Sequence, residues 1–223
     1  MNAFFAAIEQ RDFPKLLGMP VAVTNGKHGS CIITSSYEAR AFGVKTGMRL
    51  SEGKKICPNL IQRASRPNIY AAVSTNIMNI LKTITPDIQI YSVDEAFLEV
   101  TNCMRIYKNV ETIVYKIKDL IYLSENLKCS IGVSYSKSLA KFASKFDKPN
   151  GITFINRENC PVIFNKKKFE NKLKFIRKKC SSKNFKELLI MQKKYEKDFY
   201  KLNKIWAKKI YFSSHLLNRI WLY

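Results

Sequence analysis

Two short segments with the alternating pattern of β-strands, residues 88–93 and 96–101, are separated by only two residues. Because successive side chains of a strand point to opposite faces, the pattern predicts two antiparallel strands joined by a tight turn. Apolar residues also recur at helical spacing on either side of this pair, over 69–84 and 107–121. A hairpin flanked by two amphipathic helices restricts the chain to a layered fold in which helices pack on a sheet.

Further strand-like segments, 129–135 and 152–155, follow the second helix, and a helical segment separates them. The resulting order is helix, strand, strand, helix, strand, helix, strand. This order is typical of a split βαβ arrangement, in which helices cover one face of an antiparallel sheet. We therefore predict an α+β fold with a ferredoxin-like layer, whose first strand has no counterpart in the sequence.

The region that precedes these helices has the features of a small, turn-rich subdomain. Apolar runs at 20–24 and 31–34 flank a polar segment that contains glycine, which predicts a hairpin. Ser36 and Ser51 are each placed to cap a short helix, and Gly43 is placed to end the first. We expect this subdomain to be inserted beside the larger layer.

Charge and glycine content both divide the chain near Asn156. The protein carries 39 basic and 17 acidic residues, a formal net charge of +22. Residues 1–155 hold 20 of the basic and 12 of the acidic residues, so the tail carries more than half of the net charge. All eight glycines lie at or before Gly151. We therefore predict a folded region over 1–155 and a lysine-rich, helix-like tail over 156–223.

Composition narrows the class of protein. A charge of +22 favours association with a polyanion such as DNA or RNA, although basic translation factors and membrane-surface proteins share this property. No apolar run approaches the roughly 18 residues that a membrane helix needs, and the first residues lack the pattern of a signal peptide. Six scattered cysteines without a Cys-x-x-Cys pair indicate reduced thiols. We expect a cytoplasmic protein without a membrane span.

Asp94 and Glu95, at the turn of the central hairpin, are the strongest candidates for chemistry. They are adjacent carboxylates in a segment that is otherwise apolar, with Val93 before them and Ala96 after them. A buried carboxylate needs a partner cation or a metal ion. The alternative is a hairpin turn whose acids face water, which is the commoner explanation of an isolated Asp-Glu pair.

Five segments stand in order along residues 1–155. They are Phe4-Phe5-Ala6-Ala7-Ile8-Glu9, Ser36-Tyr37-Glu38-Ala39-Arg40-Ala41-Phe42-Gly43-Val44, Tyr91-Ser92-Val93-Asp94-Glu95-Ala96-Phe97-Leu98, Gly132-Val133-Ser134-Tyr135-Ser136-Lys137 and Lys148-Pro149-Asn150-Gly151. Together they resemble the motifs of Y-family (translesion) DNA polymerases of the UmuC/DinB type, bacterial members above all. Each segment alone is weak, but a chance match of all five in order is very improbable.

The resemblance implies that Asp94 and Glu95 are two of three carboxylates that bind two Mg²⁺ ions, and that the backbone carbonyl of Met1 helps to bind a metal. Ser92 precedes the acidic pair in the family as well. The first Asp of the family's Asp-x-Asp motif would fall before Met1, and Asn2 replaces the second. The loss of one carboxylate predicts severely reduced or no polymerase activity. A true start upstream of Met1 explains the pattern equally well.

The resemblance also implies a binding site for the incoming nucleotide. Tyr37, Arg40 and Lys148 match residues that bind the triphosphate, where they would neutralise negative charge. Phe5 matches the steric gate, a ring beneath the sugar that excludes a ribose 2′-hydroxyl by contact. Without the family, these residues are equally well explained as a solvated Arg and Lys, a core Tyr and a core Phe.

The family pattern assigns the fingers to about 4–66 and the palm to 1–3 and 67–155. Without its first strand, the palm sheet is expected to have one exposed central edge. The tail, 156–223, is expected to be a degenerate or atypical thumb region, because it has no glycine for the family's helix-hairpin-helix. A frame-shifted or drifted remnant explains the tail equally well.

The leading functional hypothesis is template-directed DNA synthesis past damaged bases. Its partners would be primer-template DNA and deoxynucleoside triphosphates, with a sliding clamp as a further candidate that the sequence does not decide. The competing hypothesis is a non-catalytic polymerase remnant or a basic nucleic-acid-binding module. A third hypothesis is that the tail binds anionic membranes.

Overall fold

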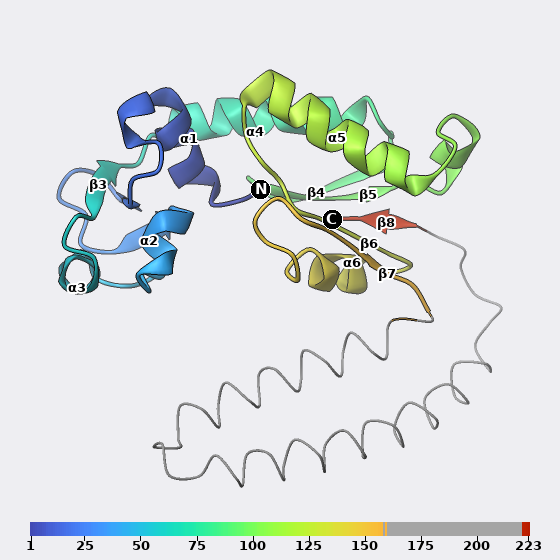
Figure 1. Ribbon diagram of the computed structural model, residues 1–223. Helices are drawn as coiled ribbons and strands as arrows, with labels where there is room; N and C mark the ends of the chain where they lie inside the picture. Colours follow the sequence, from blue (N-terminus) through green and yellow to red (C-terminus); the bar gives the residue numbers. More distant parts are fainter. Residues whose placement is uncertain (158, 160–219) are drawn as a thin grey trace, which may run out of the picture.

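The predicted hairpin and its flanking helices form a sheet with a layer of two helices on one face, as Figure 1 shows. The computed structural model describes residues 1–157, 159 and 220–223. A second, smaller sheet with short helices lies beside this layer (Figure 1). The α+β fold class predicted from the sequence is therefore confirmed.

The larger sheet has five strands in the order β4-β5-β8-β6-β7. Its members are β4 (Ile88–Ser92), β5 (Glu95–Glu99), β6 (Ile131–Ser134), β7 (Ile152–Ile155) and β8 (Trp221–Leu222). β4 and β5 form the predicted antiparallel hairpin, with Ser92 opposite Glu95 at the turn. β6 and β7 run parallel, because the chain crosses between them through a helix.

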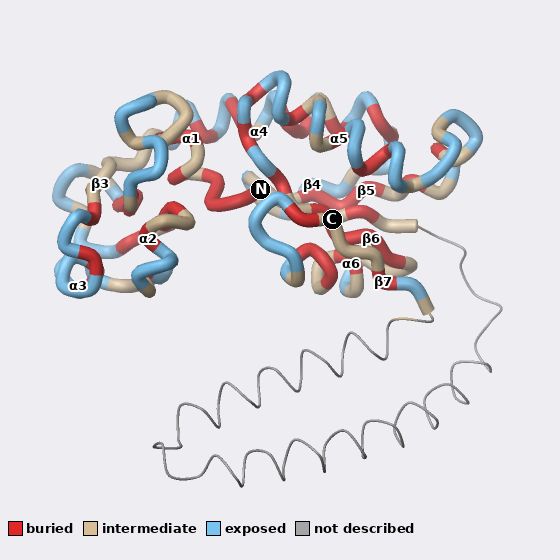
Figure 2. Tube along the Cα trace, viewed as in Figure 1, coloured by how far each residue is buried: buried red, intermediate tan, exposed pale blue. Residues whose placement is uncertain are grey.

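Three helices pack on this sheet. They are α4 (Pro67–Lys82), α5 (Val110–Glu125) and α6 (Lys137–Ala143). α4 and α5 lie side by side over one face, and α6 lies on the other side of the sheet (Figure 1). Figure 2 shows that the buried residues of α4 and α5 alternate with exposed ones, as expected of amphipathic helices.

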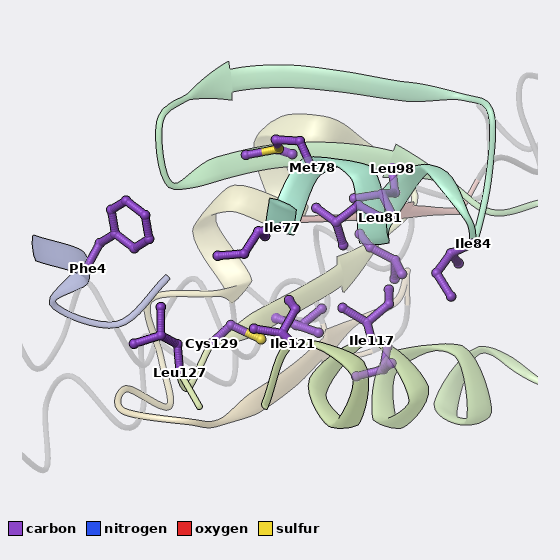
Figure 3. Close-up of a cluster of buried hydrophobic side chains, with 14 of the residues drawn as sticks. Phe4, Ile77, Met78, Leu81, Ile84, Leu98, Ile117, Ile121, Leu127 and Cys129 are labelled. Atoms are coloured by element: carbon purple, nitrogen blue, oxygen red, sulfur yellow. The ribbon is translucent and has the colours of Figure 1, made fainter. Parts of the chain in front are cut away.

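The main hydrophobic core lies between α4, α5 and the sheet. Ile77 and Leu81 of α4 meet Ile117 and Ile121 of α5, and Leu98 of β5 packs against them (Figure 3). All five side chains are almost fully buried. Burial of a side chain of this size stabilises the fold by about 1.5–3 kcal/mol, so this layer fixes the position of the hairpin above it.

The smaller sheet has the order β2-β1-β3. Its strands are β1 (Val21–Thr24), β2 (Ile32–Ser35) and β3 (Ile61–Ala64), and its helices are α2 (Tyr37–Ala41) and α3 (Leu50–Ile56). Ser36 caps α2 as predicted, since its Oγ accepts a hydrogen bond from the amide of Ala39. Ser51 does not cap α3, which begins one residue before it with Arg49 at the N-cap. The fingers and palm boundaries stay a prediction.

Helix α1 (Phe4–Asp12) precedes the smaller sheet in the chain, which also forms short 3₁₀ helices at Pro14–Leu16 and Asn102–Arg105. Glu9 of α1 is fully buried, and its carboxylate accepts hydrogen bonds from Arg63, Arg66 and Tyr70. Burial and the bond to Glu9 both raise the pKa of Tyr70. One buried carboxylate thus holds α1 against the smaller sheet and the start of α4.

The expectation of an exposed central edge in the larger sheet is wrong. Strand β8 lies between β5 and β6 and pairs antiparallel with both, so Leu222 is opposite Leu98 on one side and Val133 on the other. This strand could not be predicted from the sequence pattern, because it spans only two residues. The remaining expectations for the tail concern residues 160–219 and lie outside the described residues.

Two further expectations concern membranes and cysteines. Within the described ranges, no helix combines the length and the apolar character needed to cross a membrane. Cys31, Cys57, Cys103 and Cys129 are free thiols, and all but Cys31 are buried. Cys160 and Cys180 fall among the residues whose placement is not described.

Replacement of Gly132 by Ala is expected to lower the free energy of unfolding by about 1–3 kcal/mol or more. A Cβ at this position in β6 would collide with the backbone carbonyl of Ala140 and the backbone amide of Ser144, so α6 would have to move away from the sheet. Urea denaturation followed by circular dichroism measures the change. An unfolding free energy equal to that of the unmodified chain would contradict the close approach of α6.

Candidate active site

Asp94 and Glu95 lie together at the turn between β4 and β5, as the sequence predicts. Ser92 Oγ donates a hydrogen bond to Asp94 Oδ1 at 3.0 Å and lies 3.5 Å from Glu95 Oε2. Both carboxylates are partly exposed, at about 30% of the side chain. The two carboxylates are therefore less buried than core residues and less exposed than residues of a free surface turn. The Ser92 hydroxyl orients the pair.

Two positive charges contact these carboxylates. Lys141 of α6 lies 3.4 Å from Glu95 Oε2 and 3.6 Å from the centre of the Tyr91 ring. The amino group of Met1 donates a hydrogen bond of 2.7 Å to the backbone carbonyl of Asp94 and lies 3.9 Å from its Oδ2. Burial lowers the pKa of this amino group. The amino group therefore lies directly beside Asp94.

Burial alone would raise the pKa of Glu95. The Tyr223 hydroxyl and the Lys141 ammonium outweigh burial, so the pKa lies below its usual range. Glu95 is therefore a carboxylate at neutral pH, which is the form that binds a cation. Neither Lys141 nor Tyr223 was predicted as a site residue from the sequence.

Lys148 faces the carboxylates from the loop before β7. Lys148 is exposed in part, but burial of its ammonium lowers its pKa, while the Glu95 and Asp94 carboxylates oppose this shift. The positive charges of Arg40 and Lys145 lower the pKa of Lys148 further, so Arg40 is near enough to repel the Lys148 ammonium. The structure thus brings Lys148 to the side of the carboxylate pair.

Tyr37 and Arg40 lie on one face of α2, as their spacing predicts. The Arg40 guanidinium lies 4.9 Å from the centre of the Tyr37 ring, and its Nε donates to the carbonyl of Ser35 at 3.0 Å. Asn2 Nδ2 lies 3.4 Å from the Tyr37 hydroxyl and 3.0 Å from Ser130 Oγ. Asn2 therefore ties α2 to the larger sheet through side-chain hydrogen bonds.

Phe5 stands slightly apart from this group. Its ring stacks on Tyr70, with centroids 4.4 Å apart and an interplanar angle of 16°. Tyr70 is in turn held by its hydrogen bond to Glu9, at 2.8 Å. Phe5 is partly exposed, and its role as a steric gate stays a prediction.

Two cavities adjoin the site. The first, of about 60 Å³, is lined by Met1, Asp94, Glu95, Lys148 and Tyr223 together with core side chains. The second, of about 450 Å³, includes Asn2, Tyr37, Gln10, Arg11, Glu38 and Pro149 in its lining. The carboxylates and Lys148 therefore share one cavity, Tyr37 lines the other, and Phe5 lines neither.

Asp94 and Glu95 offer the carboxylate oxygens that Mg²⁺ prefers as ligands. In the part of the chain that the structure describes, no group of three His, Cys, Asp or Glu side chains is placed to hold a metal ion. Mg²⁺ is commonly bound by one or two carboxylates that share it with substrate phosphates and water. Asp94 and Glu95 fit an ion held jointly with a triphosphate. A site for two ions, and a role for the Met1 carbonyl, stay predictions.

Replacement of Lys148 by Met is expected to weaken binding of a deoxynucleoside triphosphate about tenfold, the effect of losing roughly 1.4 kcal/mol. Lys145 supplies the matched control, because it is exposed and neighbours the site, and Lys145→Met should change the affinity by less than twofold. The lowered pKa of Lys148 adds a pH dependence, since its charge is lost at lower pH than that of an ordinary lysine. Fluorescence titration would contradict this role if both variants bound equally.

A helix-backed sheet that presents two carboxylates on a hairpin, beside basic residues of a smaller subdomain, defines a polymerase-type palm with fingers. The sequence profile described as the impB/mucB/samB family matches residues 1–145. The chain belongs to this family, that of the Y-family translesion DNA polymerases. The resemblance inferred from the five motifs is thereby confirmed.

Individual relatives support the same assignment. DNA polymerase IV of Staphylococcus epidermidis is 44% identical over 165 residues, which is 73% of this chain and 46% of the relative. DNA polymerase IV of Gluconobacter oxydans is 39% identical over 155 residues, 70% of this chain and 44% of the relative. The chain thus spans less than half the length of these relatives.

Solved structures agree with the fold. The crystal structure of DinB from Sulfolobus solfataricus has a TM-score of 0.66 at 36% identity, covering 72% of this chain and 48% of that one. An insertion ternary complex of Dbh DNA polymerase has a TM-score of 0.67 at 35% identity, covering 74% of this chain and 49% of that one. The match is confined to about half of each solved chain.

Proposed function

We propose that this chain binds a deoxynucleoside triphosphate with Mg²⁺ at Asp94 and Glu95 and adds the nucleotide to a DNA primer, past damaged bases. The observation that carries the proposal is the presentation of both carboxylates on the β4–β5 turn, in one cavity with Lys148. The relatives named DNA polymerase IV support the choice of reaction.

The chain's own residues suit separate parts of this task. Asp94 and Glu95 would hold Mg²⁺, which when bound activates the attacking hydroxyl and stabilises the leaving pyrophosphate. Lys148 and Arg40 would neutralise charge on the phosphates, and this electrostatic stabilisation is the main protein contribution to phosphoryl transfer. Phe5, fixed on Tyr70, would contact the sugar.

The partners follow from the reaction and the charge. Primer-template DNA and deoxynucleoside triphosphates are the proposed ligands, and the net charge of +22 favours the approach of DNA. A ternary complex is known for the related Dbh polymerase. A sliding clamp remains a further candidate partner, and the cytoplasm the proposed location.

Primer extension with Mg²⁺ tests the proposal. The unmodified chain should extend a labelled primer, Asp94→Ala should not extend it, and Asp87→Ala should match the unmodified chain. Asp87 is exposed near the opposite end of the same hairpin, so its replacement removes the same charge away from the site. Extension by Asp94→Ala at the rate of the unmodified chain would contradict the proposal.

The second candidate function is a non-catalytic, nucleic-acid-binding remnant. Asn2 favours it, because an amide stands beside the site where the family pattern has a carboxylate, and it is fully engaged with Ser130 and Tyr37. Binding of primer-template DNA without any Asp94-dependent extension would support this candidate. A chain to which an upstream strand with the first Asp is added should then extend the primer. That result would show that the missing ligand, and not a defect of the fold, prevents synthesis.

A further inference from the structure

Strand β8 is held by two neighbours at once. The amide of Val100 donates to the Ile220 carbonyl at 3.0 Å on the β5 side. On the β6 side, the amide of Gly132 donates to the Tyr223 carbonyl at 2.8 Å, and the amide of Tyr223 donates back at 2.9 Å. These bonds place the last four residues of the sequence in a slot in the middle of the sheet.

The side chains of β8 alternate between two kinds of surroundings. Leu222 is 1% exposed and belongs to the main core. Trp221 lies beneath Lys137, whose Nζ is 4.3 Å from a ring centre, and Tyr223 packs on Phe97 with ring centroids 4.5 Å apart. The slot thus buries Leu222 in an apolar environment, and it provides a cationic contact for Trp221 and an aromatic contact for Tyr223.

A cavity lies at the end of β8 nearest the start of β5. β8 pairs with Leu98 and Glu99 of β5. The cavity, of about 60 Å³, is lined by Leu222, Tyr223, Glu95 and Ile131. The slot therefore adjoins the candidate active site.

β8 is also the link between the two halves of the sheet. In the order β4-β5-β8-β6-β7, it separates the β4–β5 hairpin from the β6–β7 pair (Figure 1). A two-stranded hairpin alone is marginally stable in water. Because β5 begins at Glu95, the pairing of β8 with β5 helps to fix the position of the Glu95 carboxylate.

We propose that the slot between β5 and β6 is a strand-docking groove, and that residues 220–223 are the ligand whose seating holds the carboxylate hairpin in place. The groove recognises an extended segment with an aliphatic residue between two aromatic ones. The importance of the hairpin for catalysis rests on the proposed function, whereas docking itself does not.

Hydrogen exchange at two backbone amides tests docking without metal or nucleotide. The amides of Val100 and Gly132 donate to β8, so each should exchange at least tenfold faster in the full chain carrying Leu222→Asp. Leu222→Ala should give a smaller increase in a chain that stays folded. Leu123→Asp is the matched control, since Leu123 is 81% exposed on α5. Unchanged exchange in both Leu222 variants would overturn the proposal.

A peptide supplied in trans tests whether the groove binds the strand as a ligand. A peptide of residues 216–223, added in excess to the Leu222→Asp chain, should restore slow exchange at Val100 and Gly132, and the same peptide with Leu222→Asp should not. No recovery with the unmodified peptide would contradict a docking groove. Absence of primer extension by the unmodified chain, with these results intact, would instead count against the proposed function.

Discussion

A chain in which Glu9 is replaced by Ala is expected to lose about 3–5 kcal/mol of unfolding free energy, because a buried carboxylate that pairs with two partly buried arginines is removed. Glu9 is 0% exposed and accepts from Arg66 Nε at 2.7 Å and from Arg63 Nε at 3.0 Å. It also accepts from the Tyr70 hydroxyl, so the substitution leaves three donors without their acceptor. Chemical denaturation of the purified chain measures the loss.

Glu111→Ala is the control for this experiment. Glu111 is exposed in the first turn of α5, and its removal should change the unfolding free energy by less than about 1 kcal/mol. The Glu9 variant should also weaken stacking of Phe5 on Tyr70, since Tyr70 loses its partner. A Glu9 variant as stable as the Glu111 variant would show that the buried carboxylate does not hold α1 in place.

Glu95→Gln is expected to reduce Mg²⁺-dependent nucleotide incorporation at least a hundredfold, while the chain stays folded. Gln keeps the size of the side chain and can still contact Lys141, but it removes the charge that binds a cation. Losses of this order are typical when one group that stabilises developing charge is removed. Single-turnover incorporation with a labelled primer gives the rate.

Glu99→Gln supplies the comparison. Glu99 lies at the other end of β5 and is contacted by the Thr101 hydroxyl, so the same change of charge occurs in the same strand away from the turn. Its rate should stay within twofold of the unmodified chain. Equal rates for Glu95→Gln and Glu99→Gln would remove Glu95 from the proposed chemistry.

Much of the fold could be predicted because its signals are local. The β4–β5 hairpin, the two long helices and the Ser36 cap each depend on residues within a few positions of one another. The position of Asp94 and Glu95 at the turn followed from the same pattern. Strand β7 has the predicted bounds, Ile152–Ile155, because a short β-branched run after Gly151 leaves little choice.

The features that were missed depend on partners distant in sequence. β8 is a two-residue strand, and its hydrogen bonds come from Val100 and Gly132 rather than from any pattern of its own. β3 is stabilised by parallel pairing with β1. Lys141 could have been suspected from its position four residues after Lys137, which places both on one face of α6. Nothing in the sequence indicated that Tyr223 would line the carboxylate cavity.

The proposed function requires that Asp94 and Glu95 together bind a divalent cation with a triphosphate. Paramagnetic broadening by Mn²⁺ tests it most directly, read from the side-chain carboxyl carbons in the presence of a deoxynucleoside triphosphate. Strong broadening of the Asp94 and Glu95 signals is expected at Mn²⁺ concentrations that leave the Asp87 and Glu99 signals sharp. Equal broadening at all four carboxylates, or none at the pair, would contradict it.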